Sequence, residues 1–372
     1  MQFINQSSRS FKTSAFFIFW KIARFGIFIF LILLHVSCGV TKKAQDENIQ
    51  LTYLDDLIIE DSVDGIHFGG ISGIDYQNDT LFMISDSGKH PRIFTSGLQI
   101  VQQKLKLNAP QLFLDIKTAE GQYFDLESIQ KFSSSNAFLI SSEGNIKEGI
   151  APSIFKLHNN GKIVNNYTLP DNYQIINKKS EVIHNRAIEA ITFNKNKTGF
   201  WFSTEFPLRS EGKPPKLFKS GAPQQFLFYD LRTDQVTSRF KYQLDPIPKL
   251  PLLPYSLNGL TGMQLISSNQ IITIERGFSA GWGKHSNRVK LFLIQSDEAL
   301  NKTDQQSINK YLLLNLKKIK KQINADRIDN IEGICFGPSL ADGSSTLLLI
   351  SDDNFDAYND QITQLIWLKI NP

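Results

Sequence analysis

Cysteine is scarce in this chain of 372 residues, which contains only Cys38 and Cys335. Cys38 ends an N-terminal segment with the features of an export signal, so the rest of the chain cannot form an internal disulfide. Cys335 lies in the apolar run Ile334–Phe336, which favours a small core residue over a reactive nucleophile. A domain of about 330 residues without disulfides has to be stabilised by a large hydrophobic core.

An excess of positive charge is also missing outside the N-terminus. The chain has 40 basic and 36 acidic residues, and four of the basic residues fall in Met1–Cys38, where no acid occurs. The remaining chain is therefore balanced. Nucleic-acid binding relies on a basic surface that releases counterions, so this balance argues against a nucleic-acid partner.

Several catalytic motifs are absent from the sequence. It contains no Gly-x-Ser-x-Gly elbow, no phosphate-binding P-loop, no His-Glu-x-x-His and no Cys/His metal spacing. An α/β-hydrolase mechanism therefore lacks its motif, and so does a zinc protease. Ser87 in Ser-Asp-Ser-Gly is better explained by turn chemistry than by a nucleophilic role.

The N-terminal segment resembles a bacterial export signal. A basic flank precedes the apolar run Phe25–Leu34, and small residues follow it up to Cys38. A cysteine at the cleavage point predicts that Cys38 is lipidated. A single membrane anchor and plain secretion are the alternatives, although Lys21 and Arg24 interrupt the longer apolar stretch. All three interpretations place the rest of the chain outside the cytoplasm.

These features predict a signal peptide at residues 1–38, a tether at 39–50 and one folded domain at 51–372. We expect the protein in the bacterial cell envelope, in the periplasm or at the outer membrane. It would touch the membrane only through the lipid on Cys38, and we expect a monomer.

Short apolar strands alternate with Gly, Asn, Asp and Ser turns along the chain, which is an all-β pattern. Asp304–Lys321 is the best helical candidate, and part of it also reads as a strand. Five segments repeat one strand-turn-strand pattern, and the third residues of their first strands are Ser72, Glu127, Glu189, Thr261 and Glu332.

The repeat predicts a β-propeller of five blades, or six if an insertion hides a degenerate blade. The fifth unit ends with the strand Thr363–Ile370 and lacks a fourth strand. We expect Leu51–Ile59 to supply it, which would join the two ends of the domain in one blade and remove an open sheet edge.

Acidic residues occur at two fixed places in the repeat. They start the first strand of three units and end the second strand of all five. Because these two strands are antiparallel neighbours, both places lie at the same mouth of the central channel. The predicted ring consists of Glu127, Glu189 and Glu332 in an inner tier and Asp86, Glu143, Glu205, Glu275 and Asp352 in an outer tier.

A ring of carboxylates would repel itself, and a hard cation would relieve the repulsion. Calcium accepts irregular sets of six to eight oxygens, so the sequence favours Ca²⁺. The predicted metal ligands are Glu127, Glu189, Glu332, Asp86, Glu143, Glu205 and Asp352. The alternative interpretation is that some of these acids cap turns or pair with nearby arginines.

Histidine and arginine residues fall in the loops of the same mouth. Arginine suits bidentate binding of phosphate or carboxylate, and a histidine or acid can transfer protons. A metal together with these residues would equip a site that hydrolyses a small anionic ester. The candidate catalytic residues are Glu189, His184, Arg186 and Arg276.

Two runs near the C-terminus, Asp329–Ile334 and Leu347–Phe355, resemble the phytase-like family, also called the esterase-like activity of phytase family. Asn185–Glu189, Ser141–Gly144 and Ile274–Gly277 are similar to its other segments. The resemblance covers nearly the whole mature chain. It implies an exported propeller, often a lipoprotein, that hydrolyses phosphoesters or carboxylesters.

Some positions depart from the family pattern. Ala187 and Ala190 stand where glycines are expected, and Thr261 stands where an acid is possible. The Glu-Gly start of the repeat is also similar to calcium-dependent lactonase propellers. Three functions are therefore open: a metal-dependent hydrolase of phosphoesters or other anionic esters, a non-catalytic envelope propeller with a structural Ca²⁺, and a sugar-lactone hydrolase.

Overall fold

A computed structural model describes residues 49–59, 62–63, 65–88, 90–116, 123–133, 135–302, 308–356 and 361–371. The chain divides into two compact units, Met1–Thr41 and Lys42–Pro372, and all described residues belong to the second. The predicted lipidation site Cys38 and most of the 39–50 tether lie outside the described residues. Within the described part, no helix has both the length and the apolar character to cross a membrane.

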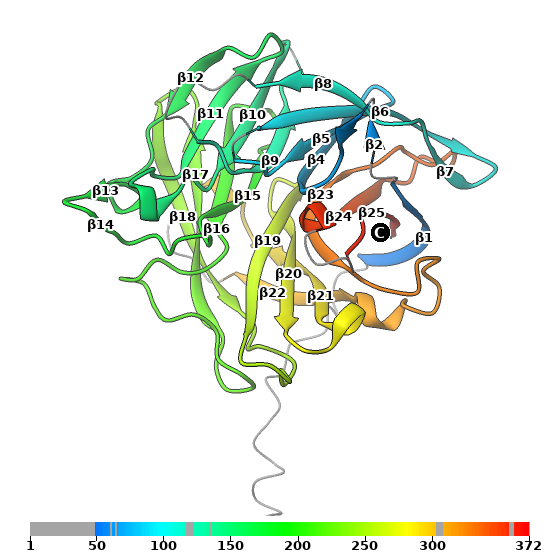
Figure 1. Ribbon diagram of the computed structural model, residues 1–372. Coiled ribbons are helices and arrows are strands. Elements are labelled where there is room, and N and C mark those ends of the chain that lie inside the picture. The colour runs from blue at the N-terminus through cyan, green and yellow to red at the C-terminus, as the bar shows by residue number, and fades with distance from the viewer. Residues whose placement is uncertain are drawn as a thin grey trace, which may run out of the picture. The chain divides into compact units, whose positions relative to one another are not determined.

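The described chain forms five antiparallel sheets that are the blades of a β-propeller (Figure 1), as the sequence predicts. Blade one contains β4 (Ile71–Gln77), β5 (Thr80–Ser85), β6 (Arg92–Val101), β7 (Lys104–Leu107) and β8 (Gln111–Asp115). Blade two contains β9 (Leu126–Lys131), β10 (Ala137–Ser142), β11 (Ser153–His158) and β12 (Ile163–Tyr167). Blade three contains β15 (Ile188–Phe193), β16 (Gly199–Thr204), β17 (Ala222–Asp230) and β18 (Gln235–Leu244).

The remaining blades complete the ring. Blade four contains β19 (Ser256–Ser267), β20 (Gln270–Ser279), β21 (Asn287–Gln295) and β22 (Asn309–Asn315). Blade five contains β23 (Asn330–Phe336), β24 (Thr346–Asp352), β25 (Gln364–Asn371) and β1 (Gln50–Ile58). The short strands β2 (Ser62–Val63), β3 (Ile66–His67), β13 (Ile175–Ile176) and β14 (Lys179–Ser180) form two small hairpins. Short 3₁₀ turns are η1 (Ile146–Glu148), η2 (Asp171–Tyr173), η3 (Gly283–His285), η4 (Leu300–Lys302), η5 (Leu316–Lys318) and η6 (Asn354–Asp356).

The first strand of each blade lies at the centre of the propeller. Each inner strand contacts the next one around the axis: β4 contacts β9, β9 contacts β15, β15 contacts β19, and β19 contacts β23. β23 contacts β4, so the inner strands form a closed ring. The hydrophobic core lies mainly between the blades. For example, Trp201 of blade three packs against Phe240 of its own blade in a cluster that also contains Met263 and Ile271 of blade four.

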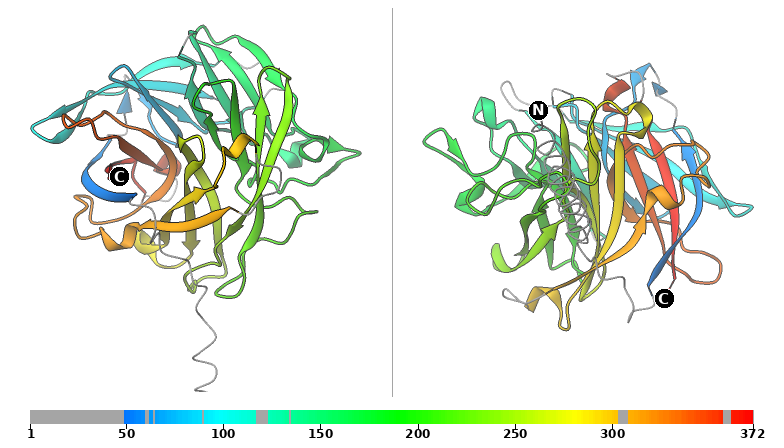
Figure 2. Two further views of the ribbon diagram at one scale, coloured as in Figure 1. Left: turned by 180° about the vertical axis from the view of Figure 1, so that it is seen from behind. Right: turned by 90° about the horizontal axis from the view of Figure 1, so that it is seen from below.

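The N-terminal strand closes the last blade, which confirms the expectation for Leu51–Ile59. β1 pairs antiparallel with β25, from Gln50 opposite Asn371 to Ile58 opposite Gln364. The right panel of Figure 2 shows the blue N-terminal strand beside the red C-terminal one. The two ends of the domain are thus held in one sheet, and no edge of β25 is left unpaired along this stretch.

A hairpin extends blade one beyond the repeat. β6 runs to Val101 and pairs with β7, and the turn between them places Gln102 and Gln103 at φ 50° and 62°. Two consecutive positive φ values match the right-handed twist of a two-residue hairpin, so the turn is favoured although neither residue is glycine. In the ambiguous segment Asp304–Lys321, the described residues form β22 and η5, so the helical interpretation is wrong.

Removing the Asp56 carboxylate should destabilise the closure of the ring. Asp56 is buried and accepts hydrogen bonds from the Tyr53 hydroxyl at 2.5 Å, the Asn324 backbone N–H at 2.7 Å and the Gln364 amide at 3.0 Å. Asp56→Ala leaves these donors unsatisfied, and we expect a loss of about 2 to 4 kcal/mol in urea unfolding.

A control for this prediction is Asp115→Ala, because the Asp115 side chain is 54% exposed and its contact to Arg92 is 3.6 Å. We expect it to change the unfolding free energy by about 0.5 kcal/mol or less. Equal losses in the two variants would show that Asp56 does not hold the closure.

Candidate functional site

The inner strands carry a β-bulge at the same place in every blade. The register shifts by one residue between Ile71 and Gly73 in blade one, and equivalent shifts occur in the other four. A bulge leaves one residue unpaired and turns its side chain away from the regular alternation. The bulged residues are the five that the repeat singles out: Ser72, Glu127, Glu189, Thr261 and Glu332.

The three bulged glutamates line one pocket of about 660 Å³. The two bulged hydroxyl residues instead tie inner strands together. Ser72 donates to the Leu126 carbonyl at 2.5 Å, and Thr261 donates to the Ile331 carbonyl at 3.0 Å. The bulge thus serves as a link between blades where the residue is short, and it supplies a carboxylate to the pocket where the residue is glutamate.

The residue that follows each bulge is small, which lets neighbouring strands approach closely. A Cβ added at Gly73 would lie 2.6 Å from the Glu127 carbonyl oxygen, and one at Gly333 would lie 2.7 Å from an Ile350 methyl group. The departure from the family pattern at Ala190 is compatible with this packing, because alanine is the smallest substitute and is fully buried there. We refer to the pocket that the three bulged glutamates line as the acidic pocket.

The outer tier follows from the strand register. The residues paired with the position just before each bulge are Ser85, Ser142, Thr204, Glu275 and Ser351. One position further along lie Asp86, Glu143, Glu205, Arg276 and Asp352. The fourth blade thus contributes an arginine where the other four contribute an acid.

The expectation that Glu275 joins the ring is wrong. It assumed that the strand ends at Glu275, whereas β20 continues to Ser279. Since side chains alternate along a strand, Glu275 faces blade three instead of the mouth. There its carboxylate is bound by the Tyr242 hydroxyl and Lys310 Nζ, both at 2.5 Å, and by the Asn258 amide at 2.8 Å.

Six of the seven predicted metal ligands line the acidic pocket. They are Asp86, Glu127, Glu143, Glu189, Glu332 and Asp352. The seventh, Glu205, is fully buried and is not among the lining residues. Its two carboxylate oxygens are bound by Arg186 Nε at 3.1 Å and by an Arg276 terminal nitrogen at 3.2 Å.

The predicted catalytic residues do not all reach the pocket. Glu189, Arg186 and Arg276 line it, whereas His184 does not. His184 is partly exposed, and its pKa is lowered by desolvation and by Lys147 and Arg186 nearby. The imidazole is therefore biased toward its neutral form at the edge of the site.

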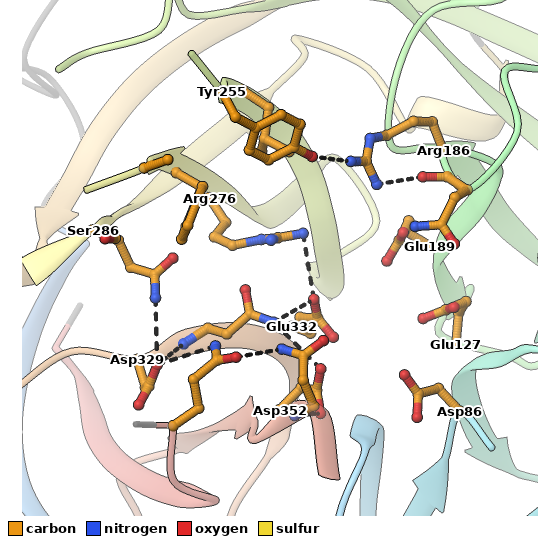
Figure 3. A pocket seen from close by; sticks show the side chains of 18 of the residues that line it. Asp86, Glu127, Arg186, Glu189, Tyr255, Arg276, Ser286, Asp329, Glu332 and Asp352 are labelled. Carbon is orange, nitrogen blue, oxygen red and sulfur yellow. Dashed lines mark hydrogen bonds and ion pairs between the residues drawn. The ribbon is translucent and has the colours of Figure 1, made fainter. Parts of the chain in front are cut away.

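Two arginines form the positive part of the acidic pocket. Arg276 bridges Glu205 and Glu332, with a terminal nitrogen 3.2 Å and 3.3 Å from their carboxylates. Figure 3 shows the pair of Arg276 with Glu332. Arg186 donates to the Tyr255 hydroxyl at 2.7 Å and to the Asn185 backbone carbonyl, and it lies over the Phe206 ring. Glu205 thus pairs with both guanidinium groups.

Sequence reasoning missed several lining residues, of which Asp125, Asp329 and Tyr255 matter most. Asp125 and Asp329 each lie one residue before an inner strand, β9 or β23. Asp125 is the first residue of the repeated pattern, which was a usable signal, whereas Asp329 lies one residue before that pattern. Asp329 accepts from the Ile362 backbone N–H at 3.1 Å and pairs with Arg327 at 3.1 Å. Tyr255 comes from a proline-rich loop, and no repeat position predicts it.

The carboxyl groups of the acidic pocket have raised pKa values. Burial is the main cause in each case. It raises the pKa of Asp125 to about 7, with Glu332 adding to the effect, and that of Glu143 to about 8, with Glu205 and Asp125 adding to it. Burial and the neighbouring carboxylates also raise the pKa values of Asp86, Glu127, Glu189 and Asp352 well above their ordinary range.

Three of these carboxylates come from blade two and lie within ligand distance of one another. Asp125, Glu127 and Glu143 each offer an oxygen, and these atoms all lie within 4.8 Å of one another. Glu189 lies close enough to Glu143 for each carboxyl group to affect the pKa of the other. On the blade-one side, Asp86 has one buried oxygen without a hydrogen-bond partner among the described residues.

Comparisons with known proteins identify the family but not a close relative. The family model described as "Phytase-like: Esterase-like activity of phytase" matches residues 66–355. A search of curated proteins finds no match to the chain.

Several solved structures are similar to this chain at low identity. An exo-1,5-α-L-arabinanase from a bovine ruminal metagenomic library is 10% identical, with a TM-score of 0.42 over 87% of this chain and 95% of that one. A GH43 β-1,3-galactosidase is 10% identical, with a TM-score of 0.46 over 85% and 94%. An exo-β-1,3-galactanase from Clostridium thermocellum is 10% identical, with a TM-score of 0.46 over 87% and 63%.

The raised pKa values predict how stability depends on pH when divalent cations are removed. Between the ordinary carboxyl pKa of about 4 and the raised values of about 7 and 8, the folded protein binds more protons than the unfolded chain. The free energy of unfolding in EDTA should therefore fall as pH rises from about 5 to 8. Each fully coupled group contributes at most about 1.4 kcal/mol per pH unit.

Glu143→Gln should flatten this slope, because the amide keeps an acceptor for the Ala187 N–H but does not ionise. Glu148→Gln is the matched control, since Glu148 is exposed and lies five residues away along the chain. Some slope will remain below pH 6, because burial also raises the pKa of Asp75, outside the pocket, to about 6. An unchanged slope in Glu143→Gln would contradict the prediction.

Proposed function

The chain belongs to the phytase-like family, and on that premise we propose that it is a metal-dependent hydrolase of phosphoesters or other small anionic esters. The supporting observation is the convergence of eight carboxyl groups and two arginines on one pocket. Such a pocket can bind a cation and an anion side by side, which is the arrangement that metal-assisted ester hydrolysis requires.

The blade-two carboxylates fit a hard cation. Asp125, Glu127 and Glu143 offer only oxygen donors, which suit Ca²⁺ or Mg²⁺ better than softer metals. Their raised pKa values express repulsion and desolvation that a bound cation would offset. A bound Ca²⁺ would supply positive charge that polarises the ester and favours ionisation of a water molecule.

The arginines are suited to orient the substrate. Arg186 and Arg276 are both held by Glu205, so their guanidinium planes keep fixed directions before a substrate binds. Preorganised donors stabilise charge that develops on an oxyanion without the cost of reorientation. In this proposal they hold the anionic oxygens of the ester opposite the carboxylates of blade two.

In this proposal Glu189 is the residue that transfers protons. Glu189 lies close to Glu143, and each carboxyl group affects the pKa of the other. Burial and the neighbouring Glu143 and Glu205 raise the pKa of Glu189, which allows it to carry a proton near neutral pH. Glu189 lines the acidic pocket and His184 does not, so the carboxyl group is the better placed of the two predicted proton carriers.

Loss of a blade-two ligand should abolish metal-dependent turnover. We expect the protein to hydrolyse at least one member of a panel of phosphomonoesters, phosphodiesters, carboxylesters and lactones, with Ca²⁺ stimulating and EDTA suppressing the rate. Glu127→Gln should lower kcat/KM by about a hundredfold or more, since it removes one charged ligand. Glu148→Gln, at an exposed position, should leave kcat/KM unchanged.

Other outcomes separate the alternatives. If Ca²⁺ raises the melting temperature of the wild type but not of Glu127→Gln, and no ester on the panel is hydrolysed, the propeller is a binding protein with a structural cation. Hydrolysis of lactones alone would identify a lactonase. If Ca²⁺ and Mg²⁺ change neither melting nor turnover, the proposed metal site is wrong.

A further inference from the structure

A second charged site lies in blade four beside the acidic pocket. It is a small recess between the 3₁₀ turns η3 and η5, which lie side by side in Figures 1 and 2. Its charged or titratable lining residues are Lys284, His285, Arg288, Lys317 and Lys320. We refer to these five residues as the basic recess. Lys284 and Asn287 line both the basic recess and the acidic pocket, so the two sites share a wall.

The charges of the basic recess are poorly neutralised by the protein. Arg288 donates to the backbone carbonyls of His285 at 3.0 Å and Asn287 at 2.7 Å, and no carboxylate among the described residues pairs with it. Lys317 likewise forms no ion pair with any residue that the structure describes. The acid near the lysines is Asp326, which is 3.8 Å from Lys284 and 4.0 Å from Lys320 and 76% exposed, so solvent screens it.

Another cation, Lys249, adds positive charge next to the basic recess. Lys249 donates to the His285 carbonyl at 3.0 Å, and its Nζ lies 3.6 Å from the centre of the Trp282 ring. Its pKa is lowered to about 8 by desolvation and by Arg288 and Lys317. Mutual repulsion among these cations would be relieved by an anion from outside the protein.

We propose that the basic recess binds a phosphate-type oxyanion. Arg288 presents a planar guanidinium whose orientation is set by two backbone carbonyls, which suits tetrahedral oxyanions. Lys317 and Lys320 add two ammonium groups around it, and Lys320 Nζ lies 3.3 Å from His285 Nδ1. An anion bound there lies next to the acidic pocket, because Lys284 and Asn287 form the common wall.

The shared wall extends the proposal to the substrate class, and this step rests on the proposed function. A substrate that places its scissile ester in the acidic pocket can place a second anionic group in the basic recess. The preferred substrates would then carry at least two phosphate or carboxylate groups. The binding of an oxyanion in the basic recess does not depend on hydrolysis and can be tested alone.

The test is calorimetric titration of the full-length protein with inorganic phosphate in EDTA, so that no divalent cation in the acidic pocket contributes. The variant is the double substitution Lys317→Ala and Lys320→Ala. Its matched control is Lys178→Ala and Lys179→Ala, two exposed lysines on the β13–β14 hairpin. We expect saturable binding of one phosphate to the wild type and the control, and binding at least about tenfold weaker to the recess variant.

Any of three results would overturn the proposal. One is the absence of saturable phosphate binding at low ionic strength, where exposed charges attract anions most strongly. Another is equal phosphate affinity of the recess variant and its control. Phosphate binding that is lost in Glu127→Gln but kept in the recess variant would also overturn it, because the anion would then occupy the acidic pocket.

The proposed preference for substrates with two anionic groups can be measured separately. If a hydrolysed ester is found, the recess variant should raise KM about tenfold for an ester with two anionic groups, and leave kcat and the KM of a single-anion ester unchanged. Equal KM changes for both esters would overturn the extension to substrates. Phosphate binding in the basic recess without turnover of any ester would contradict the proposed function but would still support the proposed anion site.

Discussion

Repulsion among buried carboxylates is the constraint on which this site depends. The acidic pocket collects acids from blades one, two, three and five, and burial raises the pKa of every member for which a shift is found. A core of this size can tolerate the cost, because the blades bury large apolar clusters on both sides of each sheet. Arg186 and Arg276 offset part of the charge: both pair with Glu205, and Arg276 also pairs with Glu332.

The bulges explain how a regular fold presents so irregular a set of side chains. An inner strand without a bulge would alternate its side chains between the neighbouring blades and direct none of them to the channel mouth. One extra residue per strand turns Glu127, Glu189 and Glu332 to the mouth while the apolar alternation continues below. The small residues that follow, such as Gly73 and Gly333, then let neighbouring strands approach closely. The same local feature therefore supplies the acids and brings the inner strands together.

The sequence predicted the fold and most of the pocket because both follow from the repeat. The number of blades, the closing role of the N-terminal strand and six of the seven ligand candidates depend on positions that recur every 55 to 72 residues. The failures lie where the repeat breaks. In blade four the strand runs on past Glu275, so a one-residue shift exchanges an acid for Arg276. Tyr255 comes from a loop unique to one blade, and the pairing of Glu205 with two arginines depends on three-dimensional proximity between blades three and four.

The break in blade four gives the site its polarity. A symmetrical ring of five acids and five bulged glutamates would bind cations anywhere around the axis. Instead blade two supplies the close group Asp125, Glu127 and Glu143, while blade four supplies Thr261 at the bulge and Arg276 in the outer tier. The charge thus changes sign across the mouth, and it becomes more positive still toward Arg288 in the basic recess. Acidic and basic residues are balanced in the folded part of the chain, so this separation of charge is a local property of the mouth. It favours a ligand that contacts a cation and positive side chains at the same time.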